Sequence, residues 1–142
     1  RRIHGKVATV YFGGRFLPAL APGQVQSTVN QYSATGGIED FDRGFAALDG
    51  SMNLLHGHGA RLLMVFSDGD YTPEHAKRTR YWLARCKALG VAVVWFGRSK
   101  DEEAVEYCAE YDVPHLVLGG NPIAAADVIG KACVEALNAA SR

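Results

Sequence analysis

The sequence predicts an α/β fold in three layers, a mostly parallel sheet with helices on both faces. Two observations lead to this prediction. Segments rich in β-branched and aromatic residues alternate along the chain with amphipathic segments of helical period, and this alternation is typical of a parallel sheet. Most strand-like segments are also apolar at every position, as in Leu62–Phe66, which indicates burial on both faces.

Four segments are predicted as strands, and each ends at glycine or at polar residues. They are residues 7–12, 62–66, 91–96 and 115–118, and the proline-containing segment 15–23 is predicted as a loop. In a parallel sheet the turns that follow the strands gather at one edge, where ligands bind. The predicted functional rim therefore consists of Gly13-Gly14 and of residues 67–70, 97–99 and 119–121.

Five helices are predicted from apolar spacing and end signals. Capping residues and prolines open three of them, at Thr72-Pro73, at the capping-box spacing of Ser99 and Glu102, and at Asn121-Pro122. The helices are expected over residues 24–32, 40–55, 72–89, 99–111 and 121–140.

Composition limits the function classes. The 142 residues carry 15 basic and 15 acidic side chains, so bulk charge gives no reason to expect nucleic-acid binding. No apolar run reaches the roughly 18 residues that span a membrane. The three cysteines show no C-x-x-C spacing, which favours buried free thiols and a cytoplasmic protein. The basic residues of the helix over 72–89 are interpreted as a solvated face.

Taken in order, the elements resemble a von Willebrand factor A (vWA) domain, a family with a Rossmann-like sheet. The strongest match is the apolar strand Leu62–Phe66 followed by Ser67-Asp68-Gly69, which is similar to the family's T/S-D-G motif. Residues 89–97 resemble the next family strand, residues 7–13 resemble its second strand, and Gly36-Gly37 resembles the family's glycine turn.

The resemblance implies a metal-ion-dependent adhesion site (MIDAS) that holds Mg²⁺ or Mn²⁺, with an open position for a partner's carboxylate. Family ligands come from a D-x-S-x-S loop, a threonine in the glycine turn and the T/S-D-G aspartate. By this resemblance Asp68 and Thr35 are the expected metal ligands. Ser67, Asp70, Glu39 and Asp40 are further rim or substitute ligands. Asp68 has an alternative interpretation as a residue that caps its own turn.

Two features depart from the family pattern. The chain contains no D-x-S-x-S, and Ile38 stands where the family has its threonine. In the family the missing first strand is central, and a sheet without it would leave two strand edges unpaired. We therefore expect residues 1–142 to form one vWA-like domain without its first strand and helix. The partner is expected to be another protein or an upstream part of the same polypeptide.

The predicted function is that of a protein-interaction or adhesion module and not of an enzyme. One alternative is a Mg²⁺-dependent phosphohydrolase with Asp68 as nucleophile and Asp70 beside it, because residues 68–72 fit the pattern D-x-D-x-T. Another alternative is a scaffold whose metal site is degenerate, in keeping with Ile38. The chain contains no P-loop and no G-x-S-x-G nucleophile elbow.

Overall fold

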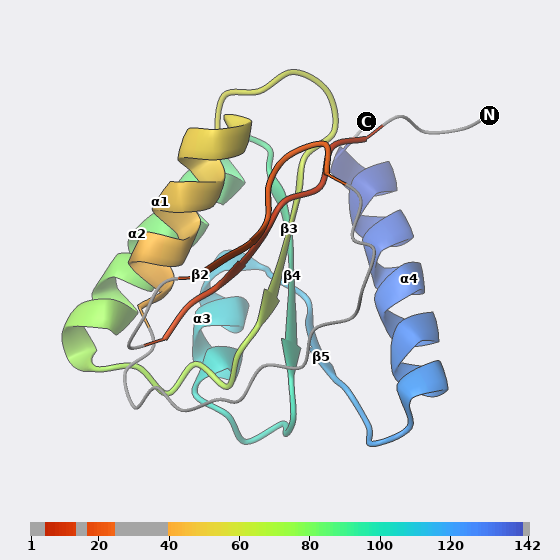
Figure 1. Ribbon diagram of the computed structural model, residues 1–142. Helices are drawn as coiled ribbons and strands as arrows, with labels where there is room; N and C mark the ends of the chain where they lie inside the picture. The colour runs from red at the N-terminus through yellow and green to blue at the C-terminus, as the bar shows by residue number, and fades with distance from the viewer. Residues whose placement is uncertain (1–4, 14–16, 25–39, 141–142) are drawn as a thin grey trace. The chain divides into compact units, whose positions relative to one another are not determined.

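The computed structural model describes residues 5–13, 17–24 and 40–140 (Figure 1). The chain divides into two compact units, Arg1–Leu54 and Leu55–Arg142, and each is described by itself. The predicted site residues Thr35 and Glu39, and the predicted helix beyond Gln24, lie outside the described residues.

The first unit contains an antiparallel pair of strands, β1 (Thr9–Tyr11) and β2 (Leu17–Leu20), and the helix α1 (Phe41–Met52). The helix predicted over residues 40–55 is confirmed. Asp40 caps it, since its Oδ1 accepts a hydrogen bond from the Arg43 backbone N–H at 3.2 Å, and this satisfies one of the free donors of the first turn.

Two predictions for this unit are wrong. The segment predicted as a loop, residues 15–23, contains β2. Residues 7–12, predicted as a buried strand of a parallel sheet, instead contain the three-residue β1, in which Thr9 and Tyr11 are exposed. The reason is that β1 forms its hydrogen bonds with the nearby β2 in an antiparallel ladder, so its apolar residues do not enter a two-sided core.

The second unit is built on a three-stranded parallel sheet, as predicted from the alternating pattern. Its strands are β3 (Leu62–Phe66), β4 (Ala92–Gly97) and β5 (His115–Val117), in the order β3-β4-β5. The helices are α2 (Pro73–Ala88), α3 (Ala104–Tyr111) and α4 (Pro122–Ala140). Helices α2 and α3 contact one another and lie on one side of the sheet, and α4 lies on the other (Figure 1).

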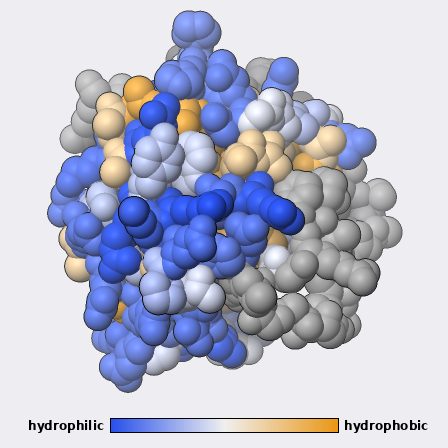
Figure 2. All heavy atoms as spheres, turned by 90° about the vertical axis from the view of Figure 1, so that its left-hand side faces the viewer, coloured by the Kyte–Doolittle hydropathy of each residue, from blue (hydrophilic) through white to orange (hydrophobic). Residues whose placement is uncertain are grey.

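The core of this unit centres on β4, where Val94, Trp95 and Phe96 are at most 1% exposed. Helix α2 buries one stripe at three- and four-residue spacing, made of Ala76, Thr79, Leu83 and Cys86. Its outer face is charged, and the side of the molecule shown in Figure 2 is largely hydrophilic. This agrees with the prediction of a solvated helix face.

The cysteines largely follow the prediction. Cys86 and Cys108 are free and buried, and Cys133 is free and partly buried. Burial raises the pKa of the Cys108 thiol to about 12, so this side chain stays protonated at neutral pH. Among the described residues, no helix combines the length and the apolar character needed to span a membrane.

Candidate functional site

The loop that follows β3, residues 67–70, is held by the neighbouring strand and helix. We call it the Asp68 loop. Three consecutive backbone carbonyls of the loop accept hydrogen bonds from side chains or backbone of β4 and α3, so its path is fixed from Ser67 to Gly69. Trp95 Nε1–H donates to Ser67 O at 2.7 Å, Ala104 N–H donates to Asp68 O at 3.1 Å, and Tyr107 O–H donates to Gly69 O at 3.1 Å.

Gly69 allows this close approach to α3. Its φ is +76°, in the left-handed region, and a Cβ at this position would lie only 2.6 Å from the backbone nitrogen of Ala104. Both conditions favour glycine. Burial raises the pKa of Tyr107, with Glu103 adding to the effect, so its hydroxyl remains a hydrogen-bond donor to Gly69 at neutral pH.

Asp68 stands at the carboxyl end of β3, as the sequence predicts, and its carboxylate is engaged on both oxygens. Oδ1 accepts the Asp70 backbone N–H at 3.2 Å, and Oδ2 contacts Arg98 Nη2 at 3.1 Å. The Asp68 side chain is 31% exposed and the Arg98 side chain 84%. Asp68 therefore caps its own turn and also pairs with a solvent-facing guanidinium.

The segment that carries Arg98 is fixed by Glu102. Oε1 of Glu102 accepts hydrogen bonds from the backbone N–H groups of Arg98 and Ser99 at 2.7 and 2.9 Å. The glutamate of the predicted capping box therefore makes its expected bond to the Ser99 backbone. Oε2 lies 3.6 Å from His115 Nε2, and both side chains are about nine-tenths buried. Gly97 makes room for this pair, because a Cβ there would overlap both Glu102 Oε2 and His115 Nε2.

The other predicted site residues have structural roles where they are described. Ser67 Oγ accepts hydrogen bonds from the Tyr71 hydroxyl at 2.9 Å and from the Gly69 N–H at 3.1 Å. Asp70 is exposed and its backbone closes the turn onto Asp68. Asp40 caps α1 in the first unit. The structure thus brings Ser67, Asp68 and Asp70 together in one loop.

Of the two expected metal ligands, Asp68 lies among the described residues and Thr35 lies outside them. Hard cations such as Mg²⁺ take several oxygen ligands, but no group of three or more His, Cys, Asp or Glu residues suited to a metal occurs among the described residues. The carboxylate of the predicted site, Asp68, already has a cationic partner in Arg98.

Sequence reasoning missed Arg98 and Glu102. A signal for Arg98 was present, because it directly follows Gly97 at the carboxyl end of β4 and so belongs to the predicted rim. Glu102 was considered only as a helix cap. Its approach to His115 depends on the pairing of β4 with β5, which sequence spacing does not reveal.

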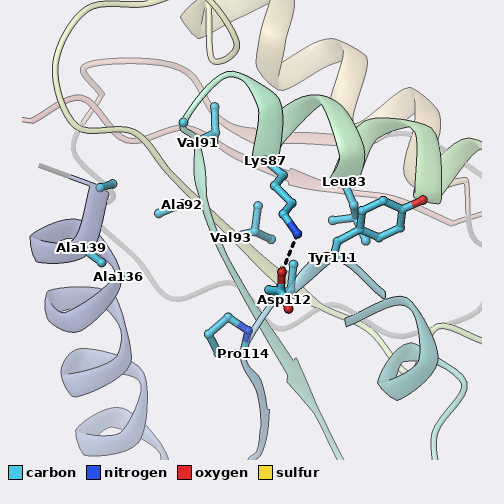
Figure 3. A pocket seen from close by; sticks show the side chains of 13 residues that line it. Leu83, Lys87, Val91, Ala92, Val93, Tyr111, Asp112, Pro114, Ala136 and Ala139 are labelled. Atoms are coloured by element: carbon cyan, nitrogen blue, oxygen red, sulfur yellow. Dashed lines mark hydrogen bonds and ion pairs between the residues drawn. The ribbon is translucent and has the colours of Figure 1, made fainter. Parts of the chain in front are cut away.

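A separate pocket of about 500 Å³ lies near the amino-terminal ends of β4 and β5 (Figure 3). Its lining is mostly apolar, from Val91, Val93 and Pro114 on the sheet side and Ala136 and Ala139 of α4. The charged residues in the lining, Lys87 and Asp112, form an ion pair with each other at 2.5 Å. Its volume is that of a small-molecule site, but its lining offers no cluster of reactive groups.

No protein-family model, curated protein or solved structure matches this chain.

Proposed function

We propose that this chain is a protein-interaction module of vWA type, with a three-layer Rossmann-like fold, that contacts its partner through the rim around Asp68. The order of elements supports this proposal, since a parallel sheet with Ser-Asp-Gly after a strand is what the family resemblance calls for. Rims at the carboxyl ends of parallel strands are also the usual place for binding in such sheets.

One observation carries the proposal. The Asp68 carboxylate is partly exposed at the rim, on a loop whose carbonyls are held at three successive positions. A fixed loop loses little conformational entropy when a partner binds. The Asp68–Arg98 pair therefore offers a preorganised polar contact that a partner can meet without refolding the loop.

Binding of a metal ion at this rim would require ligands from outside the described residues. The expected ligands of Mg²⁺ or Mn²⁺ are Asp68 and Thr35, joined by groups from another protein or from an upstream part of the same polypeptide. The contact between Arg98 and Asp68 Oδ2 competes with any such ion. It favours the second candidate function, a scaffold with a degenerate metal site.

A Mn²⁺ titration, carried out with the chain joined to the polypeptide that supplies the remaining ligands, distinguishes the two forms of the module. The readout is paramagnetic broadening of the amide signals of residues 67–70. In the metal-dependent form Asp68→Asn abolishes the broadening, and Arg98→Ala tightens Mn²⁺ binding up to about fivefold, because an exposed ion pair is worth up to about 1 kcal/mol. Lys100→Ala is the charge-matched control. Absence of broadening in all proteins favours the scaffold.

Partner capture tests the module itself. Equal amounts of wild type, Asp68→Asn and the surface control Lys77→Gln are immobilised and exposed to the same cell extract. The extract proteins that each one retains are then quantified by mass spectrometry. We expect at least one protein to be retained by wild type and Lys77→Gln and lost with Asp68→Asn. Identical sets of retained proteins on all three would contradict a role of Asp68 in binding.

A further inference from the structure

Glu102 and His115 form a buried pair of titratable side chains behind the rim. Glu102 Oε2 lies 3.6 Å from His115 Nε2, and the two side chains are 9% and 10% exposed. Neither of these two atoms has a hydrogen-bond partner among the described residues. A buried polar atom without a partner costs free energy, so the pair needs a physical explanation.

The pair is internal to the second unit. Glu102 precedes α3, and His115 begins β5, where it stands beside Trp95 of β4. Gly97 of β4 comes so close that a Cβ there would overlap both Glu102 Oε2 and His115 Nε2. All of these residues belong to Leu55–Arg142, so the contact is formed within one unit.

A proton on His115 Nε2 accounts for the contact. An ionised carboxylate only accepts hydrogen bonds, whereas an imidazolium carries a hydrogen on both ring nitrogens. The separation of 3.6 Å is longer than a hydrogen bond, but opposite charges attract at this distance, most strongly where water is excluded. Histidine is also the side chain whose charge changes between about pH 5 and 8.

Glu102 is the charged partner of His115 among the described residues. The β4 segment Ala92–Gly97 has no titratable side chain. Helix α3 contributes Tyr107 and Cys108, which are buried and stay uncharged at neutral pH because burial raises both pKa values. The other titratable residues of α3 and of the turn before it are exposed, apart from a half-buried tyrosine that donates to Glu110; they are Arg98, Lys100, Asp101, Glu103, Glu106, Glu110 and Tyr111.

His115 faces α3 and not α4. Leu116, the next residue of β5, lines a small cavity together with Ala132 and Glu135 of α4. Successive residues of a strand face opposite sides of the sheet, and α4 lies on the side opposite α3 (Figure 1). The charged groups of α4 therefore lie across the sheet from His115; they are Asp127, Lys131 and Glu135.

Glu102 links His115 to the rim. Its other oxygen, Oε1, accepts hydrogen bonds from the backbone N–H groups of Arg98 and Ser99 at 2.7 and 2.9 Å. Arg98 Nη2 in turn donates to Asp68 Oδ2 at 3.1 Å. One carboxylate thus connects a buried histidine with the turn that carries the guanidinium partner of Asp68.

We infer that a proton on His115 tightens, through Glu102, the turn that presents Arg98 to Asp68. With an imidazolium against Oε2, both oxygens of the Glu102 carboxylate are held and the turn is anchored. With a neutral imidazole this attraction is lost, and the turn opens more often. His115 and Glu102 are then positioning residues for Arg98. The inference rests on the proposed function, because it describes a pH-dependent regulation of the same rim.

Solvent exchange of two backbone amides tests the inference. Exchange of the Arg98 and Ser99 N–H groups is measured by NMR between about pH 5 and 8, and each rate is divided by the intrinsic rate at that pH. Protection of both amides should fall about fivefold as the pH rises, the amount by which hydrogen bonds to charged groups exceed neutral ones. The midpoint should coincide with the midpoint of the His115 ring-proton shift.

Variants assign the pH dependence to the pair. His115→Gln cannot take up a proton, and Glu102→Gln has no charge to attract an imidazolium, so protection should be independent of pH in both. If one of them does not fold, the other carries the test. His58→Gln, the same change at an exposed histidine, should behave as wild type does.

The inference and the proposed function fail separately. Asp68→Asn should keep the pH dependence of the two amides, so a loss of partner capture in that variant leaves this result intact. The inference is overturned if protection in wild type does not change with pH, if its midpoint differs from that of the His115 ring, or if His115→Gln retains the change.

Discussion

Replacing Gly69 by alanine tests how tightly α3 holds the Asp68 loop. Two effects add at this position. The φ of +76° costs a residue with a Cβ about 1–2 kcal/mol. The new Cβ would also lie 2.6–2.8 Å from the nitrogen, Cα and Cβ of Ala104, and overpacking of this kind costs about 1–3 kcal/mol. Together they lower the free energy of unfolding by about 2–5 kcal/mol.

The assay is urea denaturation followed by tryptophan fluorescence, since the buried Trp95 bonds directly to the loop. With an m-value of about 1–3 kcal/mol per molar urea, the midpoint should fall by at least about 0.7 M. Gly59→Ala is the matched control. Its φ is +84°, and a Cβ added there would meet no atom within 4 Å, so it isolates the backbone cost of about 1–2 kcal/mol. Equal losses in the two variants would refute the claimed contact with Ala104.

Three further predictions concern the same unit. Gly97→Ala should destabilise the protein by about 1–3 kcal/mol, because its Cβ would overlap Glu102 Oε2. An unchanged urea midpoint would argue against the buried Glu102–His115 pair. Trp95→Phe should cost about 0.5–1.5 kcal/mol by removing the hydrogen bond from Trp95 Nε1–H to the Ser67 carbonyl, and thermal unfolding by circular dichroism measures it. With Ellman's reagent at pH 8, Cys133 should react first and Cys108 only on unfolding. Burial raises the pKa of the Cys108 thiol to about 12, so its reactive thiolate forms only as the pH approaches that value. Equal reaction rates for the two thiols would contradict this.

The second unit was well predicted from sequence because its signals are local and agree with each other. Thr72 and Pro73 open α2, and the Thr72 hydroxyl accepts the His75 N–H at 3.4 Å. The apolar runs that precede and follow this helix pair in parallel as β3 and β4. Local propensity, end signals and burial all point to the same elements there.

The first unit was predicted less well because short apolar segments leave the pairing partner open. The strand over residues 7–12 carries β-branched and aromatic residues whether it joins a parallel sheet or a hairpin. Its antiparallel pairing with Leu17–Leu20 depends on hydrogen bonds to a segment whose prolines, Pro18 included, are typical of a loop. Pairing partners are a tertiary property, so this error is expected of sequence reasoning.

The sequence predicted the position of the loop that carries the candidate site, but it did not predict the side-chain contacts that the loop makes. The end of an apolar strand at Ser67-Asp68 placed the loop correctly. The ion pair of Asp68 with Arg98, 30 residues later, follows from the lateral pairing of β3 with β4 and not from any spacing in the chain. The family resemblance predicts Asp68 as a metal ligand, which stays a prediction, and the structure adds its guanidinium partner Arg98.

Residue-resolved amide hydrogen exchange across β3, measured by NMR on the free chain, tests the central structural claim most directly. The claim is that β3 pairs with β4 on one side and that no other strand of the described residues pairs with its other side. The predicted result is alternation, with slow exchange at Leu63, Val65 and Ser67 and fast exchange at Leu62, Met64 and Phe66. Uniformly slow exchange along the strand would mean that the outer edge is already paired, and uniformly fast exchange would mean that β3 does not pair with β4 as described.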